Sequence, residues 1–259
     1  MSDSRSKTDL FRALLTIAAT VGTIAVNYMA ATGKFGGVSV ETISNRYPTL
    51  ITPSGFAFTI WNLIYLGLLV FSIYQIAGNN LSRFRSIRSL YILSCALNCA
   101  WIFFWVQERI DISFVIISAL FIVLFLIILR VRSHKNYAEY WSVKSPFGLY
   151  FGWITAAAVV NLAVLLSSLG HPISVLTGSL FILAAAAMGV LIRAKFGNYL
   201  YPLAIAWAAT GIAVKQSGNT WIVVASAAAV VACLIASLSF ITKLPTRAEQ
   251  LETRNQPNL

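Results

Sequence analysis

Residues 58–65 read FTIWNLIY and lie in a stretch from Tyr47 to Ser82 that contains no charged residue. A helix crosses the hydrocarbon core of a bilayer with roughly 17–25 apolar residues, so this stretch predicts a membrane span. Leu and Ile are the least costly residues where a helix faces only lipid. Trp61, Asn62 and Tyr65 therefore need contacts other than lipid, and Asn62 is expected to contact another helix.

The same charge-free pattern recurs along the chain. Of the 259 residues, 58% are hydrophobic and 10% are charged, whereas a soluble domain is nearer half apolar and a quarter charged. The pattern predicts an all-α integral membrane protein with about eight transmembrane helices. We expect these helices near residues 12–31, 55–77, 88–107, 111–131, 146–167, 172–193, 198–215 and 219–242.

The Lys and Arg residues support this topology. Fifteen of the 19 fall in segments on one side of the eight-helix arrangement and four fall on the other. Positive charge marks the cytoplasmic face, so we expect cytoplasmic tails at residues 1–11 and 244–259, in a bacterial inner (plasma) membrane. The net charge of +11 then matches anionic lipid headgroups and gives no reason to expect nucleic acid as a partner.

The long first loop and the first helix complete the organisation. Residues 32–54 are rich in Gly, Ser and Pro yet carry several apolar residues, so we expect a non-cytoplasmic loop that packs back onto the bundle. The first helix is interpreted as a retained span and not as a signal peptide, because its apolar part is long and lacks a clear cleavage pattern.

Ionisable residues are expected outside the spans. The eight acidic residues fall in predicted tails, loops or helix ends, and His134 and His171 lie in or beside loops. No two such residues have metal-ligand spacing inside a predicted helix. The sequence therefore predicts no catalytic residue, no metal site and no resident cofactor, and it favours a binding protein over an enzyme.

Aromatic and amide side chains share faces on three predicted helices. They recur at spacings of three and four residues in Phe58–Trp61–Tyr65, in Asn98–Trp101–Trp105 and in Trp153–Ala157–Asn161, and such spacings place side chains on one helix face. An Asn amide cannot be left unpaired in lipid, so these faces serve either helix packing or a pocket for a flat, largely apolar ligand. For Thr16, Thr20 and Thr23 we expect bonds to the preceding helical turn.

Three motifs carry a resemblance to a known family. They are TPSGFAFTIWNLIY at residues 52–65, ALNCAWIFF at residues 96–104, and a Tyr, Trp and Asn at positions 150, 153 and 161. In order and spacing they resemble the TspO/peripheral benzodiazepine receptor family of tryptophan-rich membrane proteins. The resemblance covers about residues 10–168 and includes the long first loop.

The resemblance implies a fold and a site. It implies a five-helix TspO-like bundle at residues 12–168, followed by three additional membrane helices at 169–243. Family members bind porphyrins, cholesterol-like lipids and benzodiazepine-type drugs, so the implied ligand is porphyrin- or haem-related. The implied ligand-binding residues are Trp61, Tyr65, Asn98, Trp101, Tyr150, Trp153, Ala157 and Asn161.

Departures from the family pattern leave several functions open. No Tyr-x-Arg follows Asn161, so the cholesterol-type motif of animal members is missing. The favoured function is a receptor or carrier for tetrapyrroles or other planar apolar ligands. The alternatives are a secondary transporter of amphipathic metabolites and a structural or regulatory membrane subunit. Membrane lipids are expected partners, and a homodimer remains open.

Overall fold

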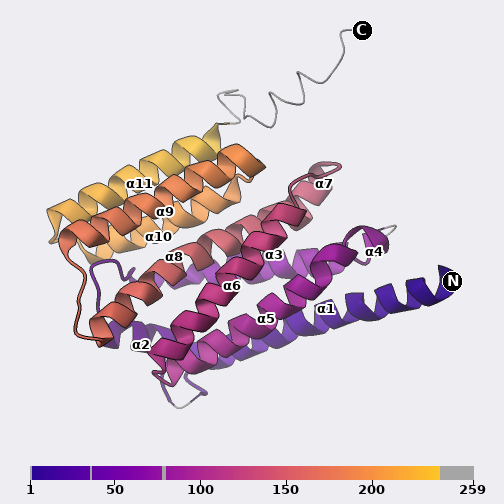
Figure 1. Cartoon of the computed structure of the whole chain (residues 1–259), viewed down its shortest axis with the longest axis horizontal. Coiled ribbons are helices and arrows are strands. Elements are labelled where there is room, and N and C mark those ends of the chain that lie inside the picture. The colour runs from indigo at the N-terminus through magenta and orange to yellow at the C-terminus, as the bar shows by residue number, and fades with distance from the viewer. Residues whose placement is uncertain (1, 36, 78–79, 240–259) are drawn as a thin grey trace, which may run out of the picture.

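The structure is a computed structural model that describes residues 2–35, 37–77 and 80–239, and the regular secondary structure within these ranges is entirely helical (Figure 1). Seven helical segments are long and apolar enough to cross a membrane, and an eighth apolar helix, Leu200–Lys215, is shorter. The prediction of an all-α membrane protein is confirmed. The predicted tail at 244–259 lies outside the described residues.

Within the described ranges, eight long helices form the bundle. They are α1 Ser2–Ala31, α3 Ile60–Tyr74, α5 Arg85–Val106, α6 Ile110–Arg130, α8 Ser145–Ser168, α9 Val175–Phe196, α10 Leu200–Lys215 and α11 Thr220–Leu238. Short elements connect them. These are α2 Val40–Arg46, the 3-10 helix η1 Gly55–Thr59, α4 Asn80–Arg83, α7 Tyr137–Glu139 and the π-helix η2 Tyr140–Lys144.

The three C-terminal helices cover one side of the remaining bundle. In the first part of the chain α5 packs on α1 and α6, and α8 packs on α3 and α6. Helix α10 then packs against α8 and is itself flanked by α9 and α11, so that these three form a layer beside α8 (Figure 1). The C-terminal layer is therefore joined to the bundle through α8 and α10.

Small residues let α8 and α10 approach closely. A Cβ atom at Gly152 would lie 2.5 Å from the Tyr201 carbonyl oxygen and 2.8 Å from the Ala204 Cβ. At the same interface the Thr155 and Tyr201 hydroxyls share a hydrogen bond of 2.8 Å, and the Asn198 amide donates to the Lys144 carbonyl at 2.6 Å. The contact thus depends on the missing side chain at Gly152 and on paired polar groups.

The first loop packs back onto the bundle, as predicted. The Ser54 backbone N–H donates to the Gly211 carbonyl at 3.0 Å, and the Trp207 indole N–H donates to the Ala57 carbonyl at 2.8 Å. Tyr47 donates to Glu108 at 3.0 Å, and this bond raises the Tyr47 pKa because it favours the protonated phenol. Helix α10 and the connection between α5 and α6 thereby hold this segment in place.

The polar stripe of α1 is buried and hydrogen-bonded. The Thr16, Thr20 and Thr23 hydroxyls donate to carbonyls one turn earlier, at 2.8–2.9 Å, as predicted. Thr20 also bonds across the interface, to the Ser72 hydroxyl at 2.6 Å and to the Tyr91 hydroxyl at 2.7 Å. A single threonine therefore links α1 to both α3 and α5.

Helix α1 extends further towards the N-terminus than the span predicted at residues 12–31. It begins at Ser2, and Asp9 is buried at 5% exposure. Asp9 forms an ion pair with Arg85 and lies 3.8 Å from Arg88, which is fully buried. Pairing is what allows such a carboxylate to be buried.

One sequence prediction is wrong. Asn62 was expected to contact another helix, but its side chain is exposed.

Replacing Gly152 by Leu should separate α8 from α10. We expect Gly152→Leu to lose about 1–3 kcal/mol of stability, the usual cost of overpacking, and to melt at a lower temperature in detergent by tryptophan fluorescence. Gly22→Leu is the matched control, because a Cβ at Gly22 meets nothing within 4 Å. Equal melting temperatures of Gly152→Leu and Gly22→Leu would contradict the packing argument.

An aromatic cavity between the helices

Trp61 is the centre of an aromatic cluster that joins α3, α5 and α8. Its ring stacks on Tyr65 with centroids 5.4 Å apart and an interplanar angle of 19°. Its centroid is also 6.4 Å from Trp101, 6.0 Å from Tyr150 and 6.4 Å from Trp153. Trp61, for which the sequence analysis required contacts other than lipid, thus contacts four other aromatic rings.

A mostly apolar cavity opens beside this cluster. It leaves about 520 Å³ free of atoms, its open side included. Four indoles and one amide dominate its wall. The lining residues are Val40, Ser44, Pro53, Phe58, Trp61, Trp101, Trp105, Trp153, Ala156, Ala157, Val160, Asn161, Ala208 and Ile212.

The indole N–H groups of the cavity wall differ in their partners. Trp101 donates to the Asn161 side-chain oxygen at 3.2 Å, and Trp105 donates to the Val40 carbonyl at 3.2 Å. The buried Trp153 N–H has no hydrogen-bond acceptor. An unpaired buried donor costs about 1–3 kcal/mol, and Trp153 carries one while its side chain forms part of the cavity wall.

Asn161 holds the indole of Trp101 in position. Its Oδ1 accepts from Trp101 and also from the Ser113 hydroxyl at 3.3 Å, while its Nδ2 donates to the Ala157 carbonyl at 2.9 Å. The amide is therefore engaged on both atoms. The bond from Trp101 to Asn161 fixes the direction of the Trp101 indole N–H.

The structure brings five of the eight predicted site residues to the cavity wall. These are Trp61, Trp101, Trp153, Ala157 and Asn161. The other three lie behind it. Tyr65 and Tyr150 contact the Trp61 ring, and Asn98 is fully buried and accepts a hydrogen bond from Asn27 at 2.7 Å.

Asn27 and Asn98 form a polar pair between α1 and α5. Beyond their mutual bond, the Asn27 Nδ2 also donates to the Thr23 carbonyl at 2.8 Å. The Asn27 Oδ1 and the Asn98 Nδ2 are buried without partners. This pair therefore has one free acceptor and one free donor. A bound water or a polar atom of a ligand would satisfy both.

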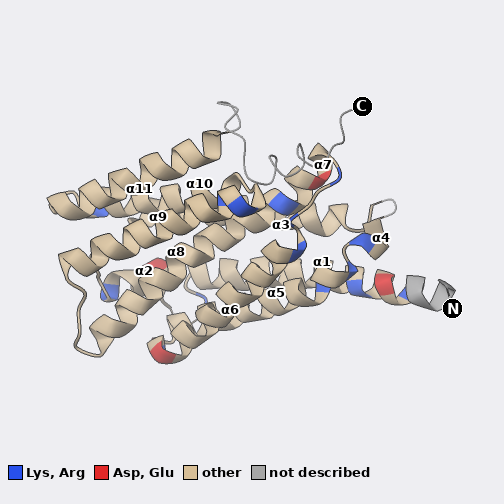
Figure 2. Cartoon of the chain, turned by 45° about the horizontal axis from the view of Figure 1, so that its top comes forward, with Lys and Arg blue, Asp and Glu red and all other residues tan. Residues whose placement is uncertain are grey.

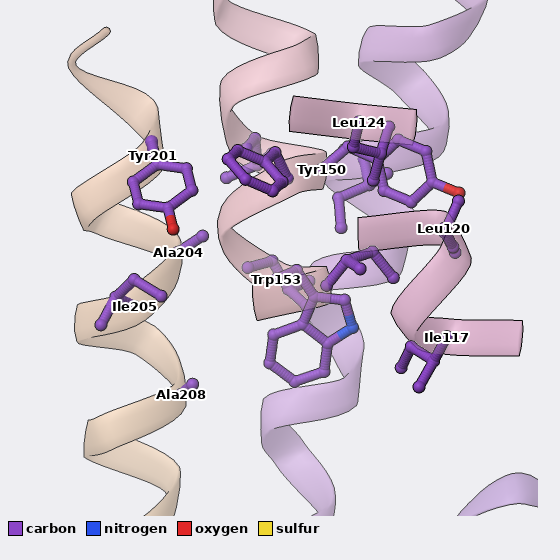
Figure 3. Close-up of a cluster of buried hydrophobic side chains, with 14 of the residues drawn as sticks. Ile117, Leu120, Leu124, Tyr150, Trp153, Tyr201, Ala204, Ile205 and Ala208 are labelled. Carbon is purple, nitrogen blue, oxygen red and sulfur yellow. The ribbon is translucent and has the colours of Figure 1, made fainter. Parts of the chain in front are cut away.

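Some cavity residues were not among the predicted site residues. Trp105 could have been included, since it follows Trp101 by four residues on the same helix face. Ala208 and Ile212 of α10 gave no signal, because small apolar residues are frequent in any membrane helix. Figure 3 shows Ala208 on α10 and Trp153 on α8, the two helices that pack together beside this cavity.

A second apolar cavity adjoins the first between α8, α9 and α10. It leaves about 330 Å³ free of atoms and is lined by Phe181, Ile182 and Ala185 of α9 among others. Four residues are common to the walls of both cavities. They are Ala156, Val160, Ala208 and Ile212.

These observations define an all-α polytopic membrane protein with an aromatic cavity between its helices. The sequence model of the TSPO-like protein family matches residues 13–241, so the chain belongs to this family. The match runs through α9, α10 and α11 as well as the region that resembled the five-helix members. No curated protein and no solved structure matches the chain.

The Asn27–Asn98 pair should show measurable coupling. In Asn27→Ala, Asn98→Ala and the double variant, we expect a coupling of about 0.6 kcal/mol, and at most about 1.7, typical of hydrogen bonds between membrane helices. The measurement is unfolding in detergent mixtures followed by circular dichroism. Asn27→Ala combined with Cys233→Ala on α11 is the control pair and should be additive, since the two residues share no partner.

Proposed function

We propose that this protein is a membrane receptor or carrier that binds a planar, largely apolar ligand of the porphyrin class in the aromatic cavity. The observation that carries the proposal is a cavity walled by four indoles, in which the buried Trp153 N–H lacks an acceptor. Aromatic faces bind a flat ring by stacking, and a few polar groups fix its orientation.

The residues divide the binding task among three helices. Trp61 and Trp101 present ring faces inclined by 32° to one another, and a planar ligand would stack on one or both. The Trp153 N–H would donate to a carboxylate or carbonyl of the ligand. Because the rings already contact each other, binding exchanges ring–ring contacts for ring–ligand contacts and requires Trp61 to shift.

The adjoining cavity supports access from the lipid. Its wall is apolar and comes from α8, α9 and α10, so an apolar ligand dissolved in the bilayer would meet no desolvation penalty there. The shared residues Ala156 and Ala208 are small, which keeps the boundary between the cavities thin. A ligand substituent could therefore extend into this second space.

A structural role is the second candidate function. It is favoured by the contacts of Trp61 with four other rings at 5.4–6.4 Å, which would stabilise the bundle without a ligand. This role predicts that loss of the Trp61 ring lowers stability, whereas the receptor role predicts that it lowers affinity.

Filling the cavity should abolish binding. In a titration of the purified protein with protoporphyrin, followed by quenching of tryptophan fluorescence, we expect saturable binding that Ala157→Phe weakens at least tenfold by occupying ligand space. Ala228→Phe makes the same change on an exposed face of α11 and should bind like the unchanged protein.

Two outcomes would count against the receptor role. Quenching that is linear, or equal in both variants, would indicate partitioning into the micelle. Unsaturable quenching together with a lower melting temperature of Trp61→Leu would assign the aromatic cluster to the structural role.

We also propose that the basic end of the bundle faces the cytoplasm, which agrees with a bacterial inner membrane. Figure 2 supports this orientation, because Lys and Arg gather at the end where α1 begins and where α4 and α7 lie. A reporter fused to the C-terminus should be active only in the cytoplasm. Activity of an external reporter at this position would reverse the orientation.

A further inference from the structure

The adjoining apolar cavity differs in chemistry from the aromatic cavity. Its wall is formed by α8, α9, α10 and one residue of the first loop, and it consists of Ala, Val and Ile side chains and the ring of Phe181. None of the described side chains that line it can donate or accept a hydrogen bond. The aromatic cavity, by contrast, has the polar side chains of Ser44 and Asn161 in its wall. A group that fills the adjoining cavity is therefore apolar along its whole length.

The two cavities meet along the contact between α8 and α10. A Cβ atom at Gly152 would lie 2.8 Å from the Ala204 Cβ. The next turn of each helix brings Ala156 of α8 and Ala208 of α10, which line both cavities. Figure 3 shows Ala204 and Ala208 one turn apart on the side of α10 that points towards Trp153. At this turn, the side chains that α8 and α10 place between the two cavities are methyl groups.

Two residues of α9 distinguish the adjoining cavity from the aromatic one. Phe181 and Ala185 are four residues apart and so lie on one face of α9. Among the described residues they line the adjoining cavity and not the aromatic cavity. Both are partly exposed, whereas Ile205 and Ala209 on the α10 side are buried at 2% and 3% exposure. The wall is therefore less tightly packed at α9, and side-chain size there sets how much space an occupant has.

A substituent of the bound ligand is favoured over a separate lipid chain as the occupant. The cavity lies between membrane helices, where lipid chains are as apolar as its wall, so a free chain gains little by entering it. A chain tethered to a ring in the aromatic cavity is held next to the boundary at a high local concentration. Its contacts with the wall are individually small but add up along its length.

We propose that the ligand of this protein is a planar ring with a long alkyl or isoprenoid substituent. The ring lies in the aromatic cavity, and the chain passes Ala156 and Ala208 into the adjoining cavity. This inference rests on the receptor or carrier function proposed above and narrows its ligand class. Phe181 and Ala185 contact the chain and so determine specificity for it.

Two esters of one ring test this assignment. Methyl pheophorbide and pheophytin, its phytyl counterpart, share one chlorin ring and differ in the ester chain. Each is titrated into the full-length protein in detergent, followed by quenching of tryptophan fluorescence. Each affinity is compared only between protein variants, so that partition of the ligand into the micelle cancels. Ala185→Phe should weaken pheophytin binding about fivefold by filling the space of the chain, and it should leave methyl pheophorbide binding unchanged.

Ala184→Phe is the matched control for this experiment. It makes the same change at the neighbouring residue of α9, which is exposed and does not belong to either cavity wall as the structure describes them. Both affinities should stay unchanged in this variant. Ala185→Leu adds a smaller side chain and should weaken pheophytin binding less than Ala185→Phe does. It takes the place of Ala185→Phe if the larger side chain prevents folding.

The outcomes separate this inference from the receptor function. Selective loss of pheophytin affinity in Ala185→Phe supports the chain site. Saturable binding of both esters with equal affinities in Ala185→Phe and Ala184→Phe would overturn the chain site and leave the receptor function in place. An equal loss of affinity for both esters in Ala185→Phe would do the same. Quenching by both esters that does not saturate would overturn the receptor function and the chain site together.

Discussion

Hydrocarbon offers no hydrogen-bond partner, and this constraint decides most polar contacts of the protein. Thr20 bonds its own helix and two others, the Trp207 indole reaches the Ala57 carbonyl, and the fully buried Arg88 is matched with Gln75 at 2.6 Å. Against this background, the buried groups that remain unpaired stand out. Trp153 is one of them and lies on the aromatic cavity.

The C-terminal layer changes the aromatic site as well as covering it. Because Gly152 allows α10 to pack directly on α8, Ala208 and Ile212 reach the cavity and close one side of it. A five-helix bundle would leave this side of α8 to lipid. The C-terminal helices thereby add one wall to the aromatic cavity and form the adjoining apolar cavity.

The two ends of the bundle differ in chemistry, and each has its own cavity. The aromatic cavity lies towards the first loop, with Val40 and Pro53 in its wall, whereas a separate cavity with Arg130 in its wall lies at the opposite ends of α5 and α6.

The sequence by itself determined the membrane class, the order of the helices and the shared faces of Trp61, Trp101 and Trp153, because hydropathy and helical periodicity are local properties. It did not determine that α1 extends back to bury Asp9, that Asn98 pairs with Asn27, or that Ala208 joins the cavity. Such contacts connect residues far apart in the chain. The sequence around a small or polar residue does not indicate which distant residue it will contact. Only the packing of the helices decided which buried polar groups found a partner and which did not.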